Sequence, residues 1–286
     1  MKTLLLSTDF SANATHAAEY GYNLAKQLKA DLVLCNAIII PAEIPQAGMV
    51  AWPLEEYDFL QKDSTDELGH LKSYLEKKSP VGSFRPDISY LTEPGTVVDV
   101  VNSAAAAQKI DMIVMGTHGA TGMEQFLLGN HSRNMIDNTT KPLLLVPPSA
   151  RIAPIKKIAF ATDFEQQDDD LASIFQLIPL AKTLNADILI THVYKEENQT
   201  PEFKKWLKGF LIDLSDKADY PHIYYRLIKH ADTETGLGWL CGHGQIDMLA
   251  MFHRQHSFFD SLLKGSHTKK MASIISVPLL VIPRKG

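Results

Sequence analysis

The chain has 286 residues, 45% of them hydrophobic and 21% charged, which is enough for about two domains with a core each. Its net charge of −5 argues against DNA or RNA as the main partner, because nucleic-acid-binding domains carry an excess of basic residues. No apolar run approaches the roughly 18 residues that a membrane span needs, so we expect neither a signal peptide nor a span. The only cysteines, Cys35 and Cys241, lie in expected core elements, which predicts buried, reduced thiols and a cytoplasmic protein.

Short apolar strands alternate with helical patterns along the first half. Residues 4–10 predict a strand and its turn, and Ser11 is the expected N-cap of a helix that reaches about Leu28. Small residues line one face of this helix and allow it to pack close to a sheet. Alternating elements predict parallel strands with right-handed crossovers, and therefore a doubly wound α/β sheet with helices on both faces. Further strands are expected near 31–37, 86–92, 111–116 and 142–146, and helices near 55–78, 96–108 and 130–138.

The second half of the chain repeats the first. Thr8-Asp9-Phe10 returns as Thr162-Asp163-Phe164, each time after an apolar strand. Several further matches follow in the same order, which predicts a duplicated unit. Because the intervening segment is rich in proline, we expect one domain over 1–148, a linker over 149–154 and a second domain over 155–286.

Two glycine-containing segments stand between a strand and a helix of the first half. Met115-Gly116-Thr117-His118-Gly119 leaves a buried strand, and Gly129-Asn130-His131-Ser132 opens a helix. Glycine has no Cβ, so the backbone of the first segment can approach a ligand closely. Unpaired N–H groups and the helix dipole favour an anion at the second. Together the two segments predict a phosphate cradle.

The spacing Gly116-x2-Gly119-x9-Gly129-Asn130 resembles the nucleotide-binding signature of the universal stress protein family. The chain start at 4–11 and the segment 141–147 resemble the first and last strands of the same family. Asn130 departs from the family pattern, which usually has Ser or Thr there, but its amide can still donate to a phosphate oxygen. Ser7 is a smaller departure, since the family commonly has Pro at that position.

The resemblance implies two tandem doubly wound domains, each with a five-stranded parallel sheet of strand order 3-2-1-4-5. In this order the ends of the first and fourth strands meet at the switch point, where such sheets bind ligands. The resemblance further implies an ATP site, in which Asp9 contacts ribose, adenine or Mg²⁺ and the main chain of Ala37 meets the adenine. The expected contact residues are Thr8, Asp9, Ala37, Met115, Gly116, His118, Gly119, Gly129, Asn130, His131 and Ser132.

Several of these residues have a second interpretation. Asp9 is also a favoured cap for the helix that starts near Ser11. Ala37 is also compatible with an ordinary strand end. His118 and His131 are either phosphate donors or solvated polar residues, whereas we expect Ser132 to donate to phosphate.

The second half has lost part of the cradle. When the halves are aligned on Gly129 and Gly265, the segment 116–119 becomes Phe252-His253-Arg254-Gln255. Side chains then stand where glycine backbone would meet a triphosphate. Glu165 replaces the equivalent of Ser11 and adds a negative charge, while Gly265-Ser266 survives. We expect this half to form an interface or to bind something else.

A cluster of histidines in the second half raises the question of a metal. His243, His253, His256 and His267 fall in expected loops or at a helix start near the end of the fourth strand of that half. No cysteine pair or His-x3-His spacing accompanies them. We therefore expect solvated loop histidines and no metal.

The sequence contains no recognisable catalytic motif, neither a nucleophile elbow nor the lysine of a P-loop. We expect an adenine-nucleotide sensor or regulatory module of a stress response, with ATP, and Mg²⁺ as an optional companion, bound by the first domain and with slow hydrolysis at most. The alternatives are an ATP hydrolase or transferase, and a nucleotide-free interaction scaffold.

Partners follow from the same resemblance. Single-domain members of the family dimerise through the last strand, an edge that otherwise leaves backbone groups unpaired. A tandem chain can pair strands 142–146 and 278–282 internally, as an intrachain pseudo-dimer that is monomeric or forms a homodimer through another surface. Besides the nucleotide we expect a protein partner that the sequence does not identify.

Overall fold

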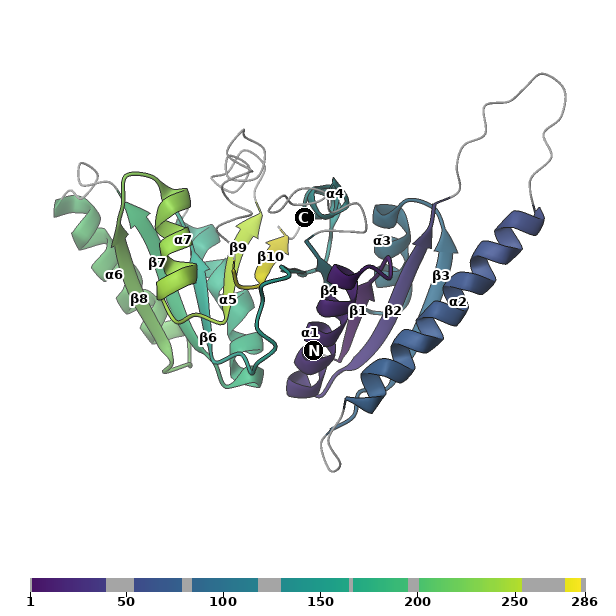
Figure 1. Cartoon of the computed structure of the whole chain (residues 1–286). Helices are drawn as coiled ribbons and strands as arrows, with labels where there is room; N and C mark the ends of the chain where they lie inside the picture. The colour runs from purple at the N-terminus through teal and green to yellow at the C-terminus, as the bar shows by residue number, and fades with distance from the viewer. Residues whose placement is uncertain are drawn as a thin grey trace, which may run out of the picture.

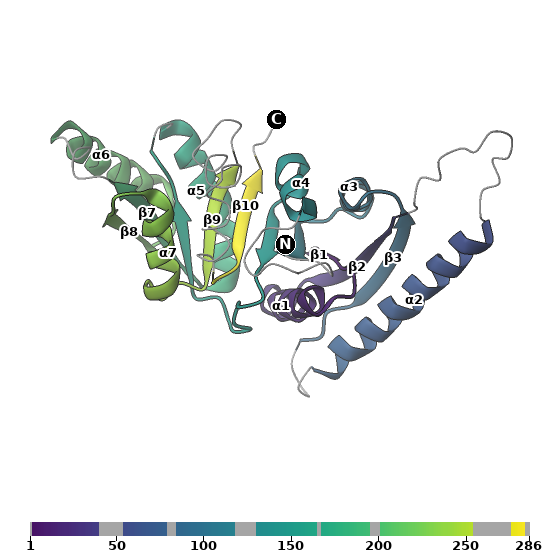
Figure 2. The ribbon, with the colours of Figure 1, turned by 45° about the horizontal axis from the view of Figure 1, so that its top comes forward.

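The computed structural model describes residues 2–39, 54–78, 84–117, 130–164, 167–194, 201–253 and 276–283 (Figure 1). Two α/β units lie side by side, with α2 and α6 at opposite ends of the molecule (Figures 1 and 2). Within the described ranges, no helix has both the length and the hydropathy to cross a membrane.

The first unit follows the expected alternation of strands and helices. Helix α1 starts where the sequence predicts, because the hydroxyl of the N-cap Ser11 accepts a hydrogen bond from the N–H of Ala14 at 3.2 Å. The first strand ends at Ser7, two residues before Asp9. The elements are β1 (Thr3–Ser7), α1 (Ala12–Leu28), β2 (Asp31–Ile38), α2 (Leu54–Lys77), β3 (Ile88–Pro94), α3 (Val97–Ala107), β4 (Met112–Gly116), α4 (Asn130–Asn138) and β5 (Leu143–Val146).

The second unit repeats this order in its described part. Its elements are β6 (Lys157–Ala161), α5 (Gln167–Leu184), β7 (Asp187–Tyr194), α6 (Pro201–Lys217), β8 (Ile223–Lys229), α7 (Thr233–His243), β9 (Met248–His253) and β10 (Leu279–Pro283). One detail shows how closely the halves correspond. Asp111 Oδ2 accepts hydrogen bonds from the N–H groups of Lys2 and Thr3, and Asp247 Oδ2 accepts them from Lys156 and Lys157. An aspartate at the equivalent position therefore links the start of the first strand to the start of the fourth strand in each unit.

The ten strands in the described parts of the chain form one sheet, in the order β3-β2-β1-β4-β5-β10-β9-β6-β7-β8. Each unit has the expected order 3-2-1-4-5 with parallel neighbours, which confirms the predicted fold class. The units join through β5 and β10, which pair antiparallel with Leu144 opposite Leu280. Figure 2 shows β10, in yellow, between β9 and the first unit. The expected intrachain pairing of the two last strands is thus confirmed, and the edge of each is covered.

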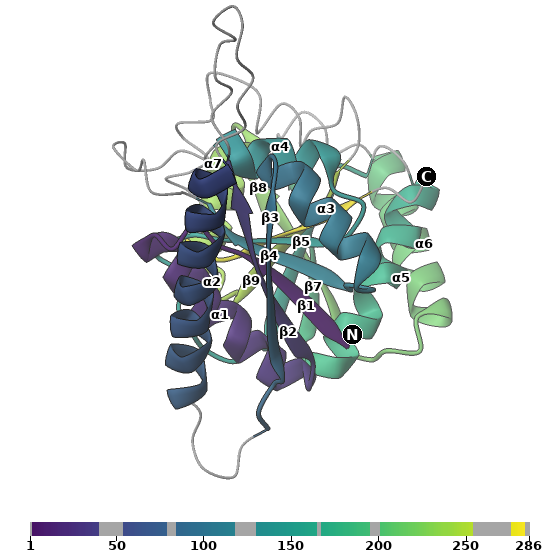
Figure 3. The same cartoon turned by 90° about the vertical axis from the view of Figure 1, so that its right-hand side faces the viewer.

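Helices cover both faces of the sheet. Alternate strand residues contribute to two apolar clusters, one with α1, α2, α5 and α6 and the other with α3, α4 and α7. In Figure 3, α1 and α2 lie on one side of the first unit's strands and α3 on the other. Helix α1 can approach its sheet closely because Gly21 has no side chain. A Cβ on Gly21 would lie only 2.9 Å from Leu6 Cδ1 and 3.4 Å from Val114 Cγ1.

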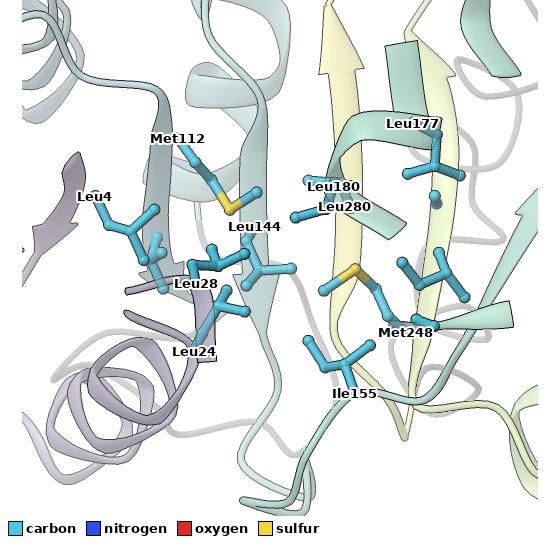
Figure 4. Packing of buried hydrophobic residues seen from close by; sticks show 14 of the residues in the cluster. Leu4, Leu24, Leu28, Met112, Leu144, Ile155, Leu177, Leu180, Met248 and Leu280 are labelled. Atoms are coloured by element: carbon cyan, nitrogen blue, oxygen red, sulfur yellow. The ribbon is translucent and has the colours of Figure 1, made fainter. Parts of the chain in front are cut away.

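The first of these clusters continues across the junction of the two units (Figure 4). Leu144 of β5 and Leu280 of β10 are buried there together with Leu28 of α1 and Leu180 of α5. Ile155, in the connection between the units, is also buried, and its N–H donates to Gln27 Oε1 at 3.0 Å. The halves therefore share one continuous apolar core.

Candidate functional site

The sheet order brings two loop-forming segments together at the carboxyl ends of β1 and β4. Register places Ser7 of β1 between Cys35 of β2 and Met115 of β4. Thr8 and Asp9 leave β1 at this level, and Gly116 ends β4. From β1 the chain continues to β2 and β3 on one side, and it then crosses to β4 and β5 on the other side of β1. The strand order therefore reverses between β1 and β4, and open parallel sheets bind ligands at such a switch point.

Thr8 and Asp9 form a tight turn between β1 and α1. Thr8 is buried, and its Oγ1 accepts a hydrogen bond from the N–H of Phe10 at 3.0 Å. Asp9 is exposed, and its Oδ1 accepts one from the N–H of Ser11 at 3.1 Å. Phe10 adopts a left-handed backbone conformation with φ of 62°, which these side chains stabilise. Ser11, and not Asp9, is the N-cap of α1.

At the neighbouring strand end, Met115 is buried and Gly116 is partly exposed. Helix α4 begins at Asn130, and His131 is exposed on its first turn. Ser132 is 2% exposed, and its hydroxyl lies 3.1 Å from the carbonyl oxygen of Gly116 and 3.3 Å from that of Thr117. A hydroxyl has one proton, so Ser132 donates to one of these two carbonyl oxygens at a time. Either hydrogen bond holds the start of α4 against the end of β4.

Ala37 lies near the end of β2, partly buried and paired with Glu93 of β3. Three of the expected contact residues, His118, Gly119 and Gly129, lie outside the described residues. The described members of the expected set thus come from the ends of β1, β2 and β4 and from the start of α4.

Sequence reasoning missed Asn36. Its Nδ2 donates a hydrogen bond at 2.8 Å to the carbonyl oxygen of Thr8, which belongs to the peptide unit that joins Thr8 to Asp9. Its Oδ1 lies 2.9 Å from the hydroxyl of Ser64 on α2, which in turn lies 2.9 Å from Thr92 Oγ1 on β3. The available signal was a polar residue near the end of an otherwise apolar strand, which requires a hydrogen-bonding partner.

The second unit repeats the turn but surrounds it differently. Thr162 Oγ1 accepts from the N–H of Phe164 at 3.1 Å, and Phe164 has φ of 60°. The carbonyl oxygen of Thr162 lies 2.9 Å from His192 Nδ1, and because a carbonyl only accepts, this nitrogen carries the proton. Burial lowers the pKa of His192, while the Thr162 carbonyl and Asp163 oppose that shift. Phe164 and Phe203 pack around the imidazole, with ring centroids 5.3 and 5.6 Å away.

The expectation of solvated loop histidines is wrong for His253. It is the last residue of β9, and its side chain is only 13% exposed. His253 Nε2 lies 3.7 Å from Asp137 Oδ1 on α4, so this pair links the two units. Phe252, beside it, packs against the core cluster that contains α5 and α6.

Other second-unit residues have simpler positions. His243 ends α7 and is not in a loop, and its ring stacks on Trp239 with centroids 5.6 Å apart. Glu165 and the stretch 254–275, which contains the other two histidines, Gln255 and Gly265-Ser266, lie outside the described residues. Among the residues that the structure describes, no three His, Cys, Asp or Glu side chains are grouped to hold a metal ion.

Known proteins are similar to this chain over different lengths. A model described as the universal stress protein family matches residues 1–147. Universal stress protein MJ0531 of Methanocaldococcus jannaschii is 29% identical over 147 residues, which cover 51% of this chain and 81% of that protein. A universal stress protein solved in complex with cAMP covers 51% of this chain and 96% of its own, at 22% identity and a TM-score of 0.34.

Solved structures also extend over both units. The crystal structure of a universal stress protein from Archaeoglobus fulgidus covers 99% of this chain and 96% of its own, with a TM-score of 0.69 and 16% identity, and so has the same fold. The family match spans 147 of the 286 residues, and the second unit repeats the strand order of the first. The chain therefore belongs to the universal stress protein family, as a member with two tandem units.

Proposed function

We propose that the first unit binds an adenine nucleotide, ATP with or without Mg²⁺, and that the protein acts as a nucleotide sensor or regulatory module in a stress response. The observation that carries this proposal is the convergence of three elements at the switch point of the sheet. The Thr8–Asp9 turn, the end of β4 and the start of α4 come together there.

The chemistry of these groups fits the parts of a nucleotide. The exposed carboxylate of Asp9 suits a ribose hydroxyl or Mg²⁺, since carboxylates accept hydrogen bonds and bind hard cations. The main chain at Ala37 suits the edge of a base. The first-turn N–H groups of α4, next to exposed His131, suit phosphate oxygens through the positive end of the helix dipole. Membership in the family and the glycine spacing support the same assignment.

We propose that the second unit does not bind ATP in the same manner. Phe252 stands where the first unit has Gly116, and its partly buried side chain packs against the core cluster that contains α5 and α6. A residue with a side chain at this position lacks the backbone freedom and close approach that glycine gives a ligand-binding loop. We assign this unit a structural role, supported by its seam with the first.

The proposal includes little or no catalysis. Phosphoryl transfer requires charge stabilisation around the γ-phosphate and a positioned nucleophile. The candidate groups include one exposed carboxylate and no lysine, which favours binding with slow hydrolysis at most. We place the protein in the cytoplasm, where its two free, buried cysteines stay reduced.

Titration calorimetry of Mg-ATP into the nucleotide-stripped full chain tests this function. We expect one site per chain, with binding abolished by Gly119→Val and weakened by Asp9→Asn. Asparagine keeps an oxygen for the N–H of Ser11 and removes only the charge, so a weaker affinity reports a role of the carboxylate. The matched control is Asp163→Asn at the equivalent position of the second unit, which we expect to bind as the parent does.

Other results would redirect the assignment. No heat of binding and no thermal shift with ATP would refute the proposal and favour the scaffold. Two equal sites would refute the structural role of the second unit. Fast release of phosphate that is lost in Gly119→Val would favour a hydrolase.

A further inference from the structure

A chain of polar groups runs beneath the Thr8–Asp9 turn, and we call it the Asn36 relay. It consists of the Thr8 carbonyl, the Asn36 amide and the hydroxyls of Ser64 and Thr92. These groups come from the end of β1, from β2, from α2 and from β3. The relay thus connects the outer helix of the first unit to the turn that presents Asp9.

Hydrogen-bonding chemistry fixes the direction of the relay. The Thr8 carbonyl only accepts, so the NH₂ group of Asn36 must face it. The Asn36 oxygen then faces Ser64, whose hydroxyl donates to it at 2.9 Å and accepts from the Thr92 hydroxyl at the same distance. Only one orientation of the amide satisfies every partner, so Ser64 holds the Asn36 side chain in place.

The fold itself does not require polar groups at this position. Ser64 is 6% exposed and continues the stripe of Leu68, Leu71 and Leu75, by which α2 packs on the sheet. An apolar side chain would serve that packing equally well. The second unit does use apolar groups, since Phe203 of α6 packs against His192.

The hydrogen bond to the turn is nevertheless present in both units. Asn36 and His192 occupy the same place in the sheet register, one residue beyond Cys35 and Thr191. Each donates an N–H to the carbonyl oxygen of the threonine that precedes an aspartate. Two different side chains thus make the same contact, and in the first unit it extends to α2 through hydroxyls.

We infer that Asn36 is a positioning residue for the proposed nucleotide site, with Ser64 and Thr92 as its supports. A peptide unit is planar, so a hydrogen bond that holds the Thr8 carbonyl also fixes the N–H and Cα of Asp9. The Asp9 carboxylate then starts from a defined backbone, next to Ala37, which the β2–β3 ladder holds. This role rests on the function proposed above.

The test combines nucleotide affinity with a measurement that needs no nucleotide. Asn36→Leu has a similar size and no hydrogen bond, whereas Asn36→His restores an N–H donor of the kind that the second unit uses. We expect Asn36→Leu to weaken Mg-ATP binding about 10-fold, the worth of one hydrogen bond, and Asn36→His to recover affinity to within about threefold of the parent. Ser64→Ala should give a smaller loss in the same direction.

Amide hydrogen exchange reads the turn directly in the nucleotide-free protein. The N–H groups of Phe10 and Ser11, bonded to Thr8 Oγ1 and Asp9 Oδ1, should exchange about 10-fold faster in Asn36→Leu and recover in Asn36→His. The matched control is His192→Leu, which should accelerate exchange at Phe164 and leave the affinity for Mg-ATP unchanged.

The two readouts separate the possible failures. If the parent binds no nucleotide, the proposed function fails, and this role for Asn36 fails with it. Unchanged exchange in Asn36→Leu shows that Asn36 does not hold the turn. Faster exchange with unchanged affinity shows that the turn does not position a nucleotide contact. If Asn36→His binds as weakly as Asn36→Leu, the N–H donor is not what matters.

Discussion

The seam between the two units can be tested through Leu144 and Leu280, which face one another in the β5–β10 ladder. Both side chains are fully buried in the cluster shown in Figure 4. Replacement of either leucine by alanine removes three buried carbon atoms, which corresponds to about 2.4 kcal/mol of transfer free energy. The cavity left behind raises the expected loss in the free energy of unfolding to about 3–4 kcal/mol for each variant.

The pair should also be coupled. Directly opposite residues of an antiparallel pair contact each other, so the double variant Leu144→Ala/Leu280→Ala should deviate from the sum of the single variants by about 0.5–3 kcal/mol. Leu32→Ala is the matched control, because it is buried in the same cluster on β2, about 19 Å from β10 at the usual strand spacing. Its loss should add to that of Leu280→Ala.

Urea denaturation followed by two signals measures both effects. Far-ultraviolet circular dichroism reports the whole chain, and in a Trp52→Phe background the fluorescence comes only from Trp206 and Trp239 of the second unit. Since the units share a core, we expect Leu144→Ala to move both transitions together. A fluorescence transition that stays in place, or strict additivity with Leu280→Ala, would refute the claim of a shared core.

Three further predictions concern individual side chains. Burial raises the pKa of Cys35 and of Cys241 to about 12, so we expect a thiol reagent at pH 8 to label neither in the folded protein and both in denaturant; fast native labelling would contradict this. Burial lowers the pKa of His192, so the unfolded chain takes up this proton at higher pH than the folded one, and stability should fall as the pH drops below about 6.5. His192→Asn should flatten that fall, and an equal slope in both proteins would count against it. Asp247→Ala removes the acceptor of two main-chain N–H groups at the start of β6 and should cost about 1.5–3 kcal/mol in urea, against about 0.3–0.5 kcal/mol for Glu76→Ala on the exposed side of α2; equal losses would show that Asp247 is dispensable.

Local sequence patterns predicted the elements of the fold well, because they depend on neighbouring residues. The apolar runs gave the strands, and Ser11 marked the start of α1 through a hydrogen bond to a residue three positions away. The repeat of Thr8-Asp9-Phe10 predicted a second turn, and both turns have the same left-handed residue. The strand order came from the family resemblance, since periodicity does not specify which strands are neighbours.

The candidate site was harder to predict from the sequence because its contacts join residues that are far apart in the chain. Ser132 was expected to meet phosphate, yet its hydroxyl reaches the Gly116 carbonyl, a contact that depends on how α4 docks on β4. Asn36 was missed because its partners lie 28 residues away in each direction. His253 was assigned to a solvated loop because Asp137, its neighbour in the folded chain, belongs to the other unit. The roles expected for His118, Gly119 and Gly129 stay predictions.

Covalent linkage changes what the β5–β10 seam can be. When two identical chains pair around a twofold axis, every substitution occurs on both sides and every off-axis contact is made twice. Here Asp137 of one unit meets His253 of the other, and either residue can change without a matching change in the other unit. The linkage also fixes the local concentration of one unit around the other. The seam therefore resists dilution, and the two halves stay together at protein concentrations at which a pair of separate chains would dissociate.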